Sequence, residues 1–146
     1  DPTAIPFPRY RSKDGSIGFS FSGLKTAVLY HVRGGDALAP TPPPEEIEAR
    51  ADVAASFETA VVDSLVEQTL KAAQEHKLER ILVAGGVACN HRLREVMTTR
   101  AEAEGRSAHF PEPKWCTDNA VMIAGIGWEL FKAGAVSDLS LDASPR

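Results

Sequence analysis

The chain has 146 residues of ordinary globular composition, and its 20 acidic and 16 basic residues give a formal net charge of −4. This length suits one domain with a real hydrophobic core. The charge excludes an overall basic surface for nucleic acid, so any such contact must be local. Cys89 and Cys116 show neither metal-ligand spacing nor a disulfide framework, which favours a reducing compartment. No apolar run could span a bilayer and no signal-peptide pattern is present, so we expect a cytoplasmic location without membrane contact.

Both ends of the sequence are polar and irregular in composition. Residues 1–17, rich in Pro, Arg and Gly, predict an irregular lead-in, and residues 138–146 predict a flexible tail. The sequence begins with Asp1 rather than Met. By its length, the chain is expected to form a single domain over residues 1–146. Its polar ends and its first residue lead us to expect that it is cut from a longer protein.

The first predicted helix covers residues 23–32, with Ser22 as a candidate N-cap. Lys25 would lie on the first turn, where a cation opposes the helix dipole. It is therefore either a solvent-facing residue or an anion contact in a cleft. The neighbouring basic residues are likewise either a solvated loop or a contact to a phosphate backbone: Arg9, Arg11 and Lys13.

A proline-rich linker leads into a long predicted helix over residues 44–76, with acidic residues in its first turn. The first part of this helix is less apolar, which allows a break near Asp52. Apolar residues recur every three or four positions and predict a buried stripe: Val53, Phe57, Val61, Val62, Leu65, Val66 and Leu70.

The stretch RILVAGGVACNHRLR (80–94) predicts a strand over residues 81–84, a glycine pair and a helix from Asn90 to about residue 104. Glycine at a strand end lets the backbone approach a ligand, and a helix N-terminus offers unpaired N–H groups. Gly85, Gly86 and Asn90 thus form either a nucleotide or phosphate site, or a tight turn with Asn90 as an ordinary N-cap. The helix is expected to bury Leu93, Val96 and Met97, and its arginines indicate a solvated face: Arg92, Arg94 and Arg100.

A second strand over residues 107–110 completes a predicted right-handed βαβ unit with parallel strands. The turn PEPKWCTDN (111–119) follows it. Thr117 or Asp118 could cap the next helix, or Asp118 could hold a metal or a metal-bound phosphate. Both polar turns follow parallel strands, at the edge where such sheets bind ligands.

The last predicted helix is apolar and ends at Gly134. Gly125 and Gly127 weaken it by about 1 kcal/mol each relative to Ala. Their presence inside a helix therefore predicts close packing against another backbone.

The sequence holds no complete catalytic apparatus. Its histidines form no HxxxH or HExxH pair, so a self-contained histidine metal site is not expected. A Walker loop, a GxSxG elbow and a paired-cysteine motif are also absent from the sequence.

Three stretches carry a family resemblance: FSFSGLKTAV (19–28), LVAGGVACNHRLRE (82–95) and CTDNAVMIAGIGWE (116–129). Their order and spacing resemble the TsaD/Gcp family of tRNA N6-adenosine threonylcarbamoyltransferases, once described as O-sialoglycoprotein endopeptidases. The helix sequence ASFETAVVDSLV (55–66) also fits. The resemblance implies an α/β chain, rich in helix with two or three short strands, that forms the C-terminal part of an ASKHA (actin-like ATPase) fold.

The resemblance also implies an activity and partners. Family members transfer a threonylcarbamoyl group from threonylcarbamoyl-AMP to N6 of adenosine 37, in tRNAs that read codons starting with A. The implied partners are tRNA, threonylcarbamoyl-AMP or an ATP- or ADP-type nucleotide, and in bacteria the proteins TsaB and TsaE. Since the first half of the family's sequence has no counterpart here, the chain alone is expected to be inactive.

Individual residues receive roles from the resemblance. Asn90 matches an adenylate-binding Asn, and Gly85 and Gly86 match the glycine turn beside the nucleotide. Asp118 matches one ligand of a divalent metal, iron or zinc, whose other ligands, an HxxxH pair, are absent from this sequence. Lys25 is a hypothesis for an anion or tRNA contact near the catalytic cleft. Cys89 stands where the family often has Ala or Ser and is given no role.

Other interpretations stay open at the sequence level. An ASKHA-type small-molecule kinase would hold ATP at the glycine turn, although the CTDN and SFSGLKT stretches argue against it. The older metallopeptidase assignment needs a metal-bound water and a general base that nothing here supplies. A non-enzymatic module that binds partner proteins is a further interpretation. With the upstream half missing, exposed surfaces predict self-association or marginal stability.

Overall fold

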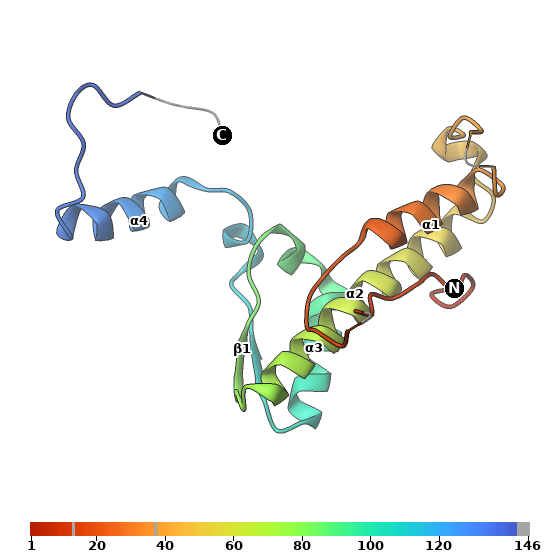
Figure 1. The fold of residues 1–146 in the computed structure, drawn as a ribbon, viewed down its shortest axis with the longest axis horizontal. Coiled ribbons are helices and arrows are strands. Elements are labelled where there is room, and N and C mark those ends of the chain that lie inside the picture. Colours follow the sequence, from red (N-terminus) through yellow and green to blue (C-terminus); the bar gives the residue numbers. More distant parts are fainter. Residues whose placement is uncertain (13, 37, 143–146) are drawn as a thin grey trace.

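The computed structural model describes residues 1–12, 14–36 and 38–142. Figure 1 shows α1 and α2 side by side, α3 and the strands at the far end of α2, and α4 projecting away from them. The described residues form four helices and two strands, the predicted α/β class: α1 (Ser22–Val32), α2 (Arg50–Glu75), β1 (Arg80–Leu82), α3 (His91–Ala103), β2 (Ser107–His109) and α4 (Ala120–Lys132). Single 3-10 turns lie between them: η1 (Pro44–Glu46), η2 (Gly86–Cys89) and η3 (Pro113–Trp115).

The central unit is a strand–helix–strand crossover. β1 and β2 pair in parallel, with Ile81 opposite Ala108 and Leu82 opposite His109, and α3 connects them. This confirms the predicted parallel βαβ unit. Because strand side chains alternate, Ile81 is only 7% exposed whereas Leu82 on the other face is 77% exposed. One face of the sheet is covered and the other is open.

The main core lies between α2, α3 and the covered face of the sheet. Positions three and four apart on a helix share one side, so each helix contributes a regular row of apolar residues. The predicted inward positions on α3, Leu93 and Met97, are buried, and Val96 packs at the margin. The buried members of this core are Val62, Val66, Leu70, Ala73, Ile81, Leu93, Met97 and Ala101.

A second, smaller cluster joins the N-terminal segment and α1 to the first half of α2. The N-terminal segment, residues 1–12, has neither helix nor strand. Its backbone is nevertheless held to α2, because the N–H of Ile5 donates to Ser56 Oγ and the N–H of Tyr10 donates to Ser64 Oγ, both at 3.1 Å. The buried members of this cluster are Phe7, Leu24, Val53 and Ala60.

Three local expectations were wrong. α2 begins at Arg50 rather than at residue 44, because Ala49 adopts a left-handed φ of 47° that separates it from η1. This interruption lies close to the break that the sequence allowed near Asp52. Ser22 is the first residue of α1 and not its N-cap, a position that Phe21 holds without a side-chain hydrogen bond. Phe57 is 37% exposed rather than part of the core, because the buried face of α2 turns away from it.

The apolar side chains of α4 are exposed, with Ile123 at 72% and Phe131 at 63%. A Cβ at Gly125 or Gly127 would meet no atom within 4 Å, so the predicted close backbone packing does not occur among the described residues. Two earlier expectations fall partly outside the described residues: Lys13 of the basic cluster and residues 143–146 of the tail. In the parts of the chain that are described, every helix is too short or too polar to cross a membrane.

Candidate functional site

Val83 and Ala84 connect β1 to a glycine turn. Gly85 has φ 88° and ψ 173°, a conformation that glycine adopts without strain and L residues rarely adopt. The turn closes through the N–H of Ala88 on the carbonyl of Gly85 at 2.9 Å and the N–H of Asn90 on the carbonyl of Val87 at 3.0 Å. A Cβ at Gly85 or Gly86 would meet no atom within 4 Å. The backbone is therefore open on that side, and Asn90 is placed at the start of α3.

Asn90 caps α3, which is one of the two roles that the sequence left open for it. Its Oδ1 accepts from the N–H of Leu93 at 2.8 Å. Its Nδ2 donates to Oε1 of Glu58 at 2.7 Å. Glu58 lies on α2, 32 residues earlier, and sequence reasoning missed it because no local spacing links the two positions. The first N–H groups of α3 have no partner within the helix and carry its positive dipole end.

Arg94 joins the two polar turns of this sheet edge. Its Nε donates to the carbonyl of Ala88 at 2.5 Å, and its Nη2 donates to the carbonyl of Pro111 at 2.7 Å. The same Nη2 lies 3.4 Å from Cys116 Sγ, and the guanidinium sits 5.0 Å from the centre of the Phe110 ring. The expectation of a solvated arginine is therefore wrong for Arg94. This side chain brings the glycine turn against the turn that precedes Asp118.

Asp118 lies just beyond this junction and is exposed. The N-cap of α4 is Asn119, whose Oδ1 accepts from the N–H of Met122 at 3.1 Å, so the predicted cap at Thr117 or Asp118 was wrong. The Asp118 carboxylate therefore does not cap α4. Within the described ranges, no three His, Cys, Asp or Glu side chains gather into a group that could hold a metal ion.

The two cysteines lie at the same junction and are not joined to each other. Cys116 is 3% exposed, and Cys89 Sγ donates to the carbonyl of Pro113 at 3.4 Å. Burial, with a smaller contribution from neighbouring Cys116, raises the pKa of the Cys89 thiol. Cys89 is therefore protonated at neutral pH, which leaves it a weak nucleophile and a weak metal ligand.

Two hollows of about 230 and 250 Å³ flank Val87 in the glycine turn. The first lies between α2 and the start of α3, and its walls are apolar apart from Glu58 and Asn90. An apolar hollow with a few converging polar groups is the usual form of a small-molecule site. The residues lining the first hollow are Phe57, Glu58, Val61, Val62, Leu65, Val87, Asn90 and Leu93.

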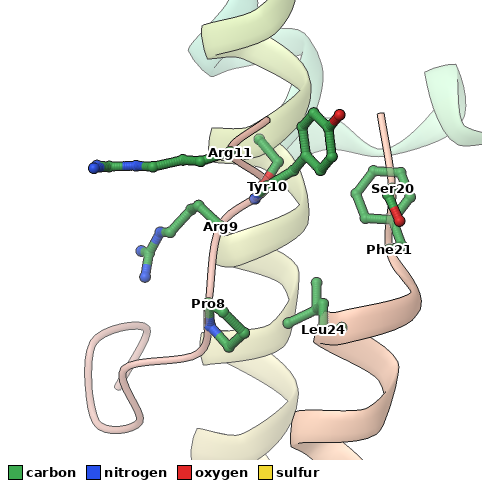
Figure 2. A pocket seen from close by; sticks show the side chains of 9 residues that line it. Pro8, Arg9, Tyr10, Arg11, Ser20, Phe21 and Leu24 are labelled. Atoms are coloured by element: carbon green, nitrogen blue, oxygen red, sulfur yellow. The ribbon is translucent and has the colours of Figure 1, made fainter. Parts of the chain in front are cut away.

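Arg9 and Arg11 are among the residues that line a different hollow of about 250 Å³. Figure 2 shows Tyr10 on one side and Phe21 on the other, with Arg9 and Arg11 pointing away from α1. Arg9 pairs with Asp63 at 2.8 Å, so its charge is already balanced. Lys25 is exposed on the first turn of α1. No hydrogen bond or ion pair among the described residues links Lys25 to Asn90 or Asp118.

The fold and this edge define a class of protein. A parallel strand, a glycine turn and a helix N-terminus in succession form the arrangement with which α/β proteins hold nucleotides and phosphates. Residues 2–125 match the family model described as "TsaD: tRNA N6-adenosine threonylcarbamoyltransferase". The chain belongs to this family. Its helix-rich architecture with a parallel βαβ unit is consistent with part of an ASKHA fold.

Curated relatives agree with the family match. The chain is 46% identical over 145 residues to the tRNA N6-adenosine threonylcarbamoyltransferase of Symbiobacterium thermophilum. It is 46% identical over 143 residues to the protein of the same name from Syntrophotalea carbinolica, and 47% identical over 143 residues to that from Geobacter sulfurreducens. These alignments cover 98–99% of this chain but 40% of each relative. The chain thus spans about two-fifths of the length of the relatives it matches.

Proposed function

We propose that this chain is part of a tRNA N6-adenosine threonylcarbamoyltransferase. The enzyme would transfer the threonylcarbamoyl group from threonylcarbamoyl-AMP to N6 of adenosine 37 in tRNAs that read codons beginning with A. In that step the bond from N6 to the carbamoyl carbon forms, the bond from that carbon to the phosphate oxygen breaks, AMP leaves and N6 gives up a proton. Membership of the family and the names of the relatives support this proposal. Since the chain spans about 40% of those relatives, we propose that it is inactive alone.

The observation that carries the proposal is the glycine turn that ends at Asn90. Gly85 and Gly86 leave backbone exposed beside the first turn of α3, where N–H groups and the helix dipole favour an anion such as the AMP phosphate. Asn90 keeps one amide hydrogen and one oxygen lone pair beyond its two observed bonds. These remaining groups suit a ribose hydroxyl or a base edge of the adenylate.

Asp118 is proposed as one ligand of a divalent metal, iron or zinc. Its carboxylate is exposed and does not cap α4, which leaves its oxygens available. A single carboxylate does not hold such an ion, and the described residues supply no group of three ligands. The residues of this chain therefore do not fit a complete metal site, and no step of the transfer is assigned to the metal.

The remaining proposals concern macromolecular partners and location. tRNA would be the acceptor substrate, and Lys25, an exposed cation on α1, is proposed as an anion or tRNA contact. The bacterial proteins TsaB and TsaE are proposed as partners. A cytoplasmic location would follow from a tRNA substrate.

The test measures transfer by the complete gene product with its partner proteins, threonylcarbamoyl-AMP and unmodified tRNA. Modified adenosine is quantified by mass spectrometry. We expect Asp118→Ala to abolish transfer and Asn90→Ser to raise the KM for the adenylate, since Ser retains the helix cap but removes the amide. Glu67→Ala is the matched control, because Glu67 is an exposed residue of α2 that lines neither hollow beside Val87.

Transfer by the unaltered protein and the control, abolished in Asp118→Ala and with a raised KM for the adenylate in Asn90→Ser, supports both the activity and the site. Transfer that survives Asp118→Ala, together with an unchanged KM for the adenylate in Asn90→Ser, contradicts the site while leaving the activity. An unaltered protein that instead phosphorylates a small metabolite with ATP contradicts the activity and favours the kinase alternative.

A further inference from the structure

The Glu58 carboxylate has an unusual environment for an acidic residue. It is half-buried on α2, and no described cation lies close enough to pair with it. It borders the apolar hollow beside the glycine turn. Its one hydrogen bond among the described residues comes from Nδ2 of Asn90 at 2.7 Å. A partly desolvated carboxylate without a cation depends on such a bond, because hydrogen bonds to charged groups are the stronger ones.

This bond fixes which way the Asn90 amide points. A carboxylate only accepts hydrogen bonds and the backbone N–H of Leu93 only donates. Nδ2 must therefore face Glu58 and Oδ1 must face Leu93, as observed at 2.7 and 2.8 Å. The opposite orientation would place Oδ1 of Asn90 against the Glu58 carboxylate, two acceptors, and Nδ2 against the N–H of Leu93, two donors. One amide hydrogen and one oxygen lone pair of Asn90 are left with defined directions.

We propose that Glu58 is a positioning residue, which holds the Asn90 amide in the orientation that binds the adenylate. This inference rests on the proposed role of Asn90 in adenylate binding. Glu58 acts as a hydrogen-bond acceptor and not through its charge, since a carboxylate beside an anionic ligand contributes repulsion rather than attraction. A neutral acceptor of similar length therefore retains the function.

The test measures AMP binding to the complete gene product by isothermal titration calorimetry, together with KM and kcat for threonylcarbamoyl-AMP. Glu58→Ala removes the acceptor, and we expect AMP to bind about tenfold more weakly, with KM raised and kcat little changed. Glu58→Gln keeps an acceptor oxygen in place, so we expect AMP affinity within about twofold of the unaltered protein. Glu67→Ala on the same helix is expected to leave affinity unchanged.

Thermal unfolding of each variant separates binding from folding. A role confined to stapling α2 to α3 would lower the Tm of Glu58→Ala while AMP affinity stayed the same, and that result overturns the proposal. Equal losses of affinity in Glu58→Gln and Glu58→Ala also overturn it, because the acceptor alone would then be insufficient.

Asn90→Ser distinguishes failure of this inference from failure of the site. If Asn90→Ser weakens AMP binding and Glu58→Ala does not, Glu58 has no positioning role although Asn90 binds the nucleotide. If Asn90→Ser leaves AMP binding unchanged, the proposed role of Asn90 itself is wrong and Glu58 has nothing to position. If both weaken binding, the double variant is expected to lose no more than Asn90→Ser alone.

Discussion

At the scale of single residues, the candidate site depends on the backbone conformation of Gly85 and on the hydrogen bonds of Asn90. An N-cap was one of two roles that its position before α3 indicated for Asn90, and the cap is confirmed. Its second bond, to Glu58, and the contacts of Arg94 were not predicted. Local spacing along the chain specifies a cap, because cap and helix are adjacent. It does not specify a partner on another helix.

Gly85 gives a direct test of the turn. Gly85→Ala is expected to destabilise the protein by about 1–3 kcal/mol, because Ala is strained at a φ of 88°. Gly86→Ala is the matched control. Gly86 has no left-handed φ and equally open surroundings, so its substitution is expected to cost less than about 1 kcal/mol. Urea unfolding measures both, and equal effects at the two positions would show that conformation at Gly85 does not govern the turn.

At the scale of elements, the N-terminal end of α3 contacts both turns at the sheet edge. Asn90 caps its N-terminus, and Arg94, near the same end of the helix, donates to the carbonyls of Ala88 and Pro111. Since these carbonyls belong to the two connections that follow β1 and β2, one side chain holds both turns together. The sequence predicted both turns at one edge, but not the arginine that joins them.

Arg94→Met tests this junction. Met retains the aliphatic length of the side chain but leaves the two carbonyls without their donors, so a loss of about 1–3 kcal/mol of unfolding free energy is expected. Arg100→Met, at an exposed position of the same helix, is expected to change stability by less than about 0.5 kcal/mol. Chemical unfolding of both variants gives the comparison. A fully stable Arg94→Met protein would mean that the two turns hold their positions independently.

At the scale of the whole molecule, apolar surface is distributed unevenly. The βαβ unit and α2 share a core, whereas the apolar residues of α4 are exposed and Figure 1 shows this helix projecting from the rest. A contiguous apolar surface of this kind favours association in water. Self-association or marginal stability of the 146-residue chain therefore stays a prediction, which the exposure of α4 supports.

Sedimentation of the 146-residue chain over a range of concentrations measures that association. We expect oligomers to form, and the double substitution Ile123→Lys with Ile126→Lys to shift them toward monomer, because each places a charge on the exposed apolar face of α4. Thr99→Lys, at an exposed position of α3, is the control for added charge. An unaltered chain that stays monomeric at every concentration and unfolds only at high temperature contradicts the prediction.

The amino-acid sequence determined the local elements of this protein. Periodic apolar residues specified α2 and α3, a short apolar run before two glycines specified β1, and Asn90 specified the start of α3. These features are set within a few residues of chain, where propensity, capping and glycine conformation act directly. Three sequence stretches were also enough to indicate the family, which the match over residues 2–125 confirms.

Tertiary structure alone decided which side chains meet. Glu58 reaches Asn90 across 32 residues, and Arg94 reaches Cys116 across 22, because α2, α3 and the sheet pack in one particular arrangement. It also decided that Phe57 lies at the edge of a hollow rather than in the core. Hydrogen bonds between elements depend on distances in space that no spacing along the chain encodes, which is why the support of the candidate site became visible only in the folded molecule.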